Sequence, residues 1–155
     1  MDTAKIVGDF FLSLWIWQMT FDLFHPAITL VAMYTLLRFS MGRKRVRSLA
    51  IAVGAQLAVL GILTAIVPAL LINTLGWSYE PLDLSHAVGM MRIFVPALSL
   101  GIFYALVQIV YFAIGRIFWR YNLISYVALT LISNGVGVAV SYLLIRAVEF
   151  SYYAG

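Results

Sequence analysis

Two short segments of the chain share the pattern Asp-Leu-x-His and contain both of its histidines. They are Asp22–His25 and Asp83–His86, and Met90 follows the second histidine by one helical turn. Residues three apart lie on one face of a helix, so each segment could present two ligands together. Two carboxylates and two imidazoles suit Zn²⁺, and a nearby methionine would favour copper. The alternatives are a proton-sensitive site, or aspartates that cap helices beside histidines at a membrane interface; we favour capping and expect no cofactor.

A second set of polar side chains interrupts the long apolar segments, namely Arg38, Gln56, Gln108, Ser133 and Asn134. Gln56 and Gln108 each lie about eight residues from the nearest basic loop, which predicts a common depth, with Arg38 at or below it. Such a layer could line a path for a solute or proton, because polar groups in lipid are costly. It could equally fix helix register through hydrogen bonds, which we favour. With no carboxylate expected at this depth, a proton relay has little support from the sequence.

Few other residues could do chemistry. The chain has no cysteine, two histidines and six acidic residues, which excludes thiol catalysis and thiolate metal sites. No P-loop, nucleophile elbow, HExxH or dinucleotide-binding pattern occurs in the sequence. We therefore expect no enzyme.

The composition identifies the solvent that surrounds most of the chain. Of 155 residues, 64% are apolar and 10% are charged, and the mean hydropathy is +1.01. A soluble domain carries about 25% charged residues. The sequence therefore predicts an all-α integral membrane protein, without nucleic acid as a partner.

The apolar runs predict one membrane domain over residues 1–155, with four transmembrane helices in a bundle. The predicted helices are 21–41, 48–75, 93–115 and 123–145, with an outer-face loop at 76–91. An amphipathic helix at 4–20 is predicted to lie along the membrane interface before them. The alternative for this segment is an additional span at 6–21 with a short re-entrant return.

Basic residues cluster in two predicted loops that contain no acid: Arg43, Lys44, Arg45 and Arg47 in one, and Arg116 and Arg120 in the other. The positive-inside rule places both loops in the cytoplasm and both termini outside. We expect the cytoplasmic membrane or its organelle equivalent.

The two predicted hairpins resemble each other. Residues 26–37 align with 96–107 at a shift of 70, with five of twelve positions identical. A parallel duplication, as in some transporters, would explain the match, and so would chance similarity between apolar segments.

Small residues recur at four-residue spacing, with Gly54, Gly61, Gly101 and Gly137 among them, and such stripes allow helices to pack closely. We favour a non-catalytic membrane subunit that packs into a larger membrane complex with other chains. The alternatives are a small homo-oligomeric transporter or channel that uses the polar layer, and an outer-face metal-binding protein.

Overall fold

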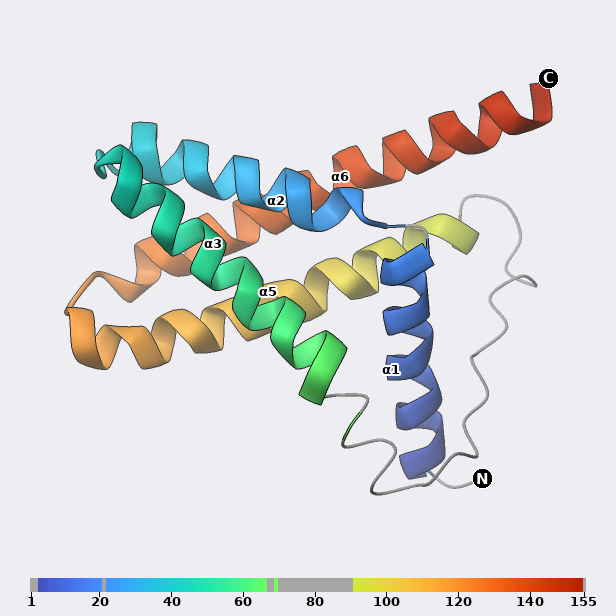
Figure 1. The fold of residues 1–155 in the computed structure, drawn as a ribbon, viewed down its shortest axis with the longest axis horizontal. Helices are drawn as coiled ribbons and strands as arrows, with labels where there is room; N and C mark the ends of the chain where they lie inside the picture. The colour runs from blue at the N-terminus through green and yellow to red at the C-terminus, as the bar shows by residue number, and fades with distance from the viewer. Residues whose placement is uncertain (1–2, 21, 67–68, 70–90, 155) are drawn as a thin grey trace.

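The computed structural model describes residues 3–20, 22–66, 69 and 91–154, and this part of the chain is helical without strands (Figure 1). In chain order the elements are α1 (Thr3–Thr20), α2 (Phe24–Thr35), the π-helical turn η1 (Leu36–Ser40), α3 (Arg45–Gly61), the π-helical turn η2 (Ile62–Ile66), α5 (Met91–Trp119) and α6 (Leu123–Ala154). The all-helical class predicted from composition is confirmed.

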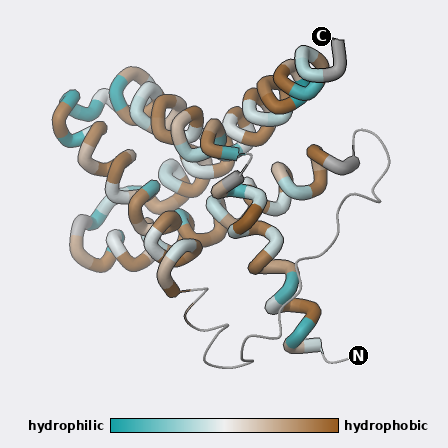
Figure 2. Tube along the Cα trace, turned by 45° about the vertical axis from the view of Figure 1, so that its right-hand side comes forward, coloured by the Kyte–Doolittle hydropathy of each residue, from teal (hydrophilic) through white to brown (hydrophobic). Residues whose placement is uncertain are grey.

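Several helices have the length and hydropathy of membrane spans. Three of the described helices meet both requirements, over Arg45–Ile66, Ile93–Phe118 and Leu123–Tyr152. A fourth span would be the bent pair Thr3–Met19 and Phe24–Ser40. Figure 2 shows that apolar residues dominate the length of these helices, and that hydrophilic residues gather where α2 meets α3. The prediction of several apolar helices of membrane-crossing length is therefore confirmed.

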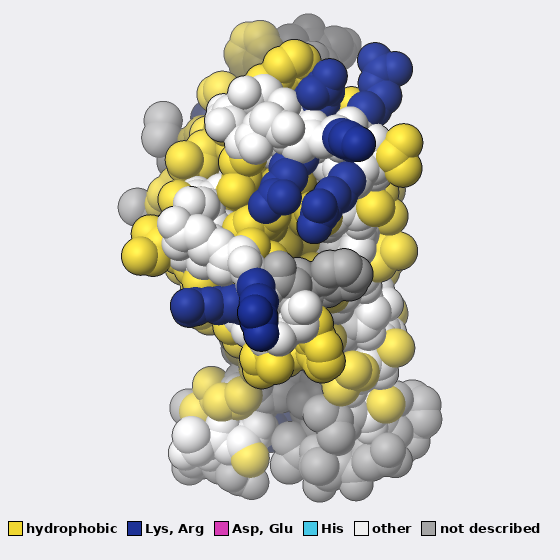
Figure 3. Space-filling model, turned by 90° about the vertical axis from the view of Figure 1, so that its left-hand side faces the viewer, with side chains coloured by type: hydrophobic (Ala, Val, Ile, Leu, Met, Phe, Trp, Pro, Cys, Tyr) yellow, Lys and Arg dark blue, Asp and Glu magenta, His cyan; other side chains and the backbone are white. Residues whose placement is uncertain are grey.

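The bundle is built on the α5–α6 hairpin. α2 lies along α6, and α3 contacts both α2 and α5. Figure 1 shows α2 and α5 running toward the same end of the bundle, and α3 and α6 running away from it. The α2–α3 and α5–α6 connections therefore lie at one end, which we call the basic end. Lys and Arg side chains gather over this face in Figure 3, where no acidic side chain is visible.

Local chemistry explains both turns at the basic end. Gly42 has a φ of +63°, a left-handed conformation that glycine adopts without steric cost, and it ends the α2–η1 helix. Arg120 ends α5 with a φ of +45°. Asn122 then caps α6, since its Oδ1 accepts the Ile124 backbone N–H at 3.1 Å.

The helices begin and end somewhat differently from the predicted spans. α5 and α6 continue beyond 93–115 and 123–145, so Arg116 lies in the last turns of α5 rather than in a loop. Arg45 and Arg47 belong to the first turn of α3. These differences arise because hydropathy marks only the apolar part of a helix, whereas the helical backbone of α5 and α6 continues through the polar residues that flank it. The predicted loop 76–91 lies outside the described residues except at Met91.

α1 turns sharply away from the bundle. Its axis and that of the Phe24–Ser40 helix are bent by 78° at the break between them. Figure 1 shows α1 running across the bundle beside α5, at the part of the bundle away from the basic end.

Buried side chains form two apolar clusters with polar residues between and beyond them. The first cluster, nearer the basic end, comprises Met33, Leu37, Ala52, Ala55, Phe112, Tyr126 and Leu129. The second comprises Leu14, Val59, Leu63, Leu100 and Tyr104. The first cluster is called the apolar barrier below, because it separates the polar interior from the basic end.

Candidate functional site

The polar interior begins with an aspartate at the start of α2. The Asp22 Oδ1 atom accepts the backbone N–H of His25 at 3.0 Å and the Ser141 hydroxyl at 2.5 Å. The first bond satisfies a free N–H group of the first helical turn, which is how a capping residue acts. The second joins α2 to α6. Asp22 and Ser141 are fully buried, so this carboxylate lies inside the bundle rather than at an exposed helix end.

His25 points from the first turn of α2 into the space between α5 and α6. Its Nε2 lies 3.3 Å from the Asn134 Oδ1 atom, and its ring packs edge-to-face on Tyr104 with 4.9 Å between centroids. Asn134 also donates through Nδ2 to the Gln108 Oε1 atom at 2.8 Å. Because Nδ2 is the donor, Oδ1 is the acceptor, and the Nε2–H group of the His25 ring can donate to it. The Nδ1 edge of the same ring packs against Gly137.

α1 reaches the same region through the side chain of Gln18. The Gln18 Nε2 atom donates to the Tyr104 hydroxyl at 2.8 Å, and both side chains are buried. Four helices therefore contribute polar side chains to one region: α1, α2, α5 and α6. We call this set, together with Asp22 just before α2, the polar cluster: Gln18, Asp22, His25, Tyr104, Gln108, Asn134 and Ser141.

Two glycines allow the helices to close around His25. A Cβ atom at Gly137 would lie 2.9 Å from the His25 Cε1 atom and 3.1 Å from the Thr29 Oγ1 atom. A Cβ atom at Gly101 would lie 2.2 Å from the Val138 Cγ2 atom. The two carbon–carbon distances, 2.9 and 2.2 Å, are shorter than carbon atoms in contact allow, so the helices can approach this closely only with glycine at these positions. The predicted packing role of Gly101 and Gly137 thus acts within this chain.

Several atoms of the polar cluster have unused hydrogen-bonding capacity. Among the described residues, no hydrogen-bond partner lies within reach of Asp22 Oδ2, Gln18 Oε1 or Gln108 Nε2, although all three atoms are buried. A buried polar atom left without a partner costs about 1–3 kcal/mol. The cluster therefore offers two acceptors and a donor to a small polar species, in a region otherwise enclosed by apolar helices.

The structure separates the five residues of the predicted polar layer. Gln108 and Asn134 bond directly, whereas Ser133 is buried and donates to the Leu129 carbonyl of its own helix at 2.7 Å. Gln56 is buried on α3 and makes no hydrogen bond to a described residue. Arg38 lies outside the layer: it is exposed and donates to the Arg43 carbonyl at 3.3 Å, because its long side chain reaches the polar basic end.

The remaining packing and basic residues fall into two groups. Gly54 lies against α5, since a Cβ atom there would be 2.9 Å from the Tyr111 hydroxyl oxygen. Gly61 faces open space, with nothing within 4 Å of a Cβ atom. The basic residues Arg43, Lys44, Arg45, Arg47, Arg116 and Arg120 all belong to the basic end.

The structure describes only some of the residues that the sequence suggested as metal ligands. Asp22 and His25 belong to the polar cluster, whereas Asp83, His86 and Met90 lie outside the described residues. Within the described ranges, no group of three His, Cys, Asp or Glu side chains could hold a metal ion. Asp22 and His25 therefore have no third ligand of these types in the described part of the chain.

Sequence reasoning missed Gln18, Tyr104 and the role of Ser141 in the cluster. A signal for the α6 part was present: Thr130, Asn134, Gly137 and Ser141 are polar or small and recur at spacings of four, three and four residues. Such spacing places them on one face of an otherwise apolar helix. No comparable pattern marks Gln18, whose partner lies 86 residues away.

Comparison with protein-family models gave no match. Searches of curated proteins and of solved structures gave no significant match either.

Proposed function

We propose that the protein is a multipass membrane transporter in which Asp22 and His25 take up a proton from the side of the membrane opposite the basic end. The observation that carries this proposal is the complete burial of both side chains among the helices of the bundle. Ionisable groups inside membrane segments are costly, and they mark proton relays and substrate paths in transporters. The sequence alone disfavoured a proton relay for want of a buried carboxylate, and Asp22 supplies one.

The depth of the polar cluster supports access from the far side. Asn134 lies 11 residues and Ser141 lies 18 residues beyond Leu123, the first residue of α6. At the rise of an α-helix these separations are about 17 and 27 Å from the basic end. Ser141 and Asp22 thus lie near the far boundary of a hydrocarbon layer about 30 Å thick. With the basic end in the cytoplasm, the cluster would take its proton from outside.

The hydrogen bonds suggest which atom receives the proton. Oδ1 of Asp22 already accepts two hydrogen bonds, whereas Oδ2 has no partner among the described residues. A proton entering from outside would bind at Oδ2 and convert the carboxylate to a neutral acid. His25, three residues further along α2, is the nearest ionisable side chain of the polar cluster, and a proton passed to its ring would return Asp22 to the carboxylate form.

The apolar barrier supports a gated mechanism rather than an open channel. It separates the polar cluster from the basic end with fully or almost fully buried side chains, among them Met33, Leu37 and Phe112. A proton on His25 would therefore reach the basic end only after the helices rearrange. This property is expected of a carrier that exposes its site to one side at a time.

Proton uptake into liposomes tests the proposal. Purified protein is reconstituted with an entrapped pH dye, a membrane potential negative inside is imposed, and acidification of the lumen is followed. We expect uptake by the wild type and its loss in Asp22→Asn, which keeps the shape and the capping oxygen. Ser133→Ala is the matched control, because Ser133 is buried on α6 but bonds only to its own helix. Uptake no faster than in empty liposomes, or equal uptake by Asp22→Asn, would refute the proposal.

A second function, that of a subunit in a larger membrane complex, is favoured by one exposed surface. Gly61, Ala65 and Ala69 follow one another at four-residue spacing along and beyond α3, and all three are exposed. Stripes of this kind let a neighbouring helix approach closely. Native mass spectrometry of gently extracted protein would detect co-purifying chains. Gly61→Leu should release them and Gly135→Leu should not, since Gly135 also faces open space but lies on α6.

A further inference from the structure

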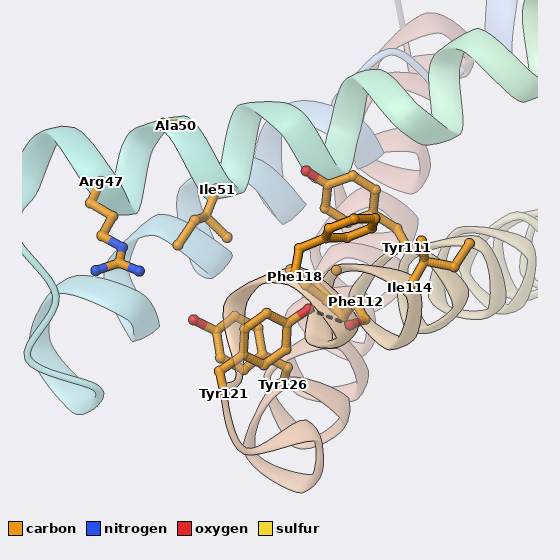
Figure 4. A pocket seen from close by; sticks show the side chains of 10 residues that line it. Arg47, Ala50, Ile51, Tyr111, Phe112, Ile114, Phe118, Tyr121 and Tyr126 are labelled. Carbon is orange, nitrogen blue, oxygen red and sulfur yellow. Dashed lines mark hydrogen bonds between the residues drawn. The ribbon is translucent and has the colours of Figure 1, made fainter.

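A pocket of about 480 Å³ opens at the basic end, away from the polar cluster (Figure 4). It lies between the first turns of α3 and the last turns of α5, with the beginning of α6 as its floor. Its volume is in the range of cavities that hold small organic ligands. No residue of the polar cluster lines it. The pocket therefore has no part in the proton site proposed above.

The walls of the pocket are aromatic and held in place. The rings of Tyr121 and Tyr126 lie 4.1 Å apart at an angle of 32°, and the Phe112 ring lies 4.9 Å from that of Tyr126. The Tyr121 hydroxyl donates to the Phe112 carbonyl, which fixes the ring across the α5–α6 turn. Burial, with Tyr126 and Tyr111 beside it, raises the pKa of Tyr121, so this hydroxyl stays protonated and keeps its donor role. The apolar surface is thus preformed.

The mouth of the pocket carries a positive charge. Figure 4 shows the Arg47 side chain extending from α3 toward the side of the pocket that the Tyr121 and Tyr126 rings line. Arg47 is exposed and forms no ion pair within the described part of the chain. The sequence has no acidic residue between Asp22 and Glu80, or between Asp83 and Glu149. Among the described residues no acidic side chain pairs with Arg47, so its guanidinium is available to an anionic group of another molecule.

The surroundings of the pocket are those of a membrane boundary. Ile114 and Phe118 line it on α5 while remaining 55% and 75% exposed, so apolar surface continues outward from the pocket. A free anion would use Arg47 but would gain nothing from aromatic walls. A neutral apolar molecule would use the walls but not the guanidinium. An anionic phospholipid matches both, with its phosphate on the arginine and an acyl chain along the rings.

From this combination we infer that the pocket binds one anionic phospholipid, with Arg47 holding the headgroup phosphate. Basic pockets between membrane helices on the cytoplasmic side are known to bind such headgroups. The pocket shares Phe112 and Tyr126 with the apolar barrier but contains no residue of the polar cluster, so lipid binding is measured without reference to proton uptake.

Native mass spectrometry of delipidated protein in detergent tests the inference, with phosphatidylglycerol and phosphatidylcholine titrated separately. We expect phosphatidylglycerol to bind at least fivefold more tightly to the wild type. Arg47→Gln should weaken phosphatidylglycerol about fivefold, the effect of one basic side chain on an anionic lipid. It should weaken phosphatidylcholine less, because the choline cation of that lipid offsets the charge of its phosphate. Ala50→Trp, which fills the pocket from an exposed position of α3, should weaken both lipids.

Arg45→Gln is the matched control, since Arg45 lies in the same first turn of α3 but does not line the pocket. A loss in this control equal to that of Arg47→Gln would indicate a diffuse basic surface and overturn the inference. Equal binding of the two lipids by the wild type would do the same. Displacement of phosphatidylglycerol by inorganic phosphate, together with no effect of Ala50→Trp, would assign the arginine to a free anion instead.

Discussion

Replacing Gly101 by alanine gives a direct test of how α5 and α6 cross. The added Cβ atom would lie 2.2 Å from the Val138 Cγ2 atom, whereas carbon atoms in contact are about 3.5–4.0 Å apart. The helices must therefore separate by more than 1 Å, or Val138 must leave its rotamer, which a β-branched side chain in a helix resists. Overpacking of this kind costs about 1–3 kcal/mol. The better helix propensity of alanine returns about 1 kcal/mol, so we expect a net loss of up to about 2 kcal/mol.

The assay is reversible unfolding in mixed micelles, with unfolding followed by circular dichroism. Gly135→Ala is the control, because Gly135 is a helical glycine of the same bundle with nothing within 4 Å of a Cβ atom. It should be neutral or slightly stabilising. Val138→Ala removes the clashing methyl groups, so the double variant Gly101→Ala/Val138→Ala should be more stable than the sum of the two single effects by about 1 kcal/mol. Equal stability of Gly101→Ala and Gly135→Ala, with no coupling to Val138, would refute the proposed crossing point.

Two further predictions concern the polar cluster. Asn134→Leu should destabilise the protein by about 1–2 kcal/mol in the same assay, because it leaves the buried Gln108 Oε1 atom and the His25 Nε2–H group without partners. The control Thr130→Val should cost less, because the Thr130 hydroxyl bonds only to its own helix. Tyr104→Phe removes the hydroxyl that accepts from Gln18 and should increase amide hydrogen exchange in α1 while leaving exchange in α6 unchanged. Equal protection of α1 in the wild type and in Tyr104→Phe would mean that the Gln18–Tyr104 bond does not hold this helix in place.

The sequence predicted the helices better than it predicted their contacts. Long apolar runs locate α3, α5 and α6 because membrane hydropathy acts on each segment separately. The sequence paired Gln108 with Gln56 by depth, whereas in the structure Gln108 bonds to Asn134 of the adjacent helix. Arg38 was placed in the same layer because sequence position gives depth but not direction, and its side chain turns toward the basic end.

The burial of Asp22 could not be read from the sequence for a physical reason. Its carboxylate bonds to Ser141, 119 residues away on α6, and it lies at the break between two helices bent by 78°. A polar residue between two apolar segments is usually an exposed connection, and hydropathy treats it as one. Asp22 is buried only because α2 packs along α6, which encloses the connection before α2 within the bundle.

The direction of α1 leads to a prediction about topology that separates the two interpretations of the N-terminal segment. Eighteen helical residues span about 27 Å, but a helix inclined at 78° to the Phe24–Ser40 axis advances only about 6 Å along it. Lys5 should therefore lie on the same side of the membrane as Asp22, not across it. Because the chain has no cysteine, Lys5→Cys and Asn122→Cys each provide a single reactive thiol.

In sealed right-side-out vesicles, a membrane-impermeant maleimide should label Lys5→Cys from outside and should reach Asn122→Cys, at the basic end, only after the vesicles are opened. Labelling of both positions from the same side would mean that α1 is a span of its own and that Asp22 lies on a re-entrant turn. The proton of the proposed function would then have to cross α1 as well, and the assignment of Asp22 as its first acceptor would fail.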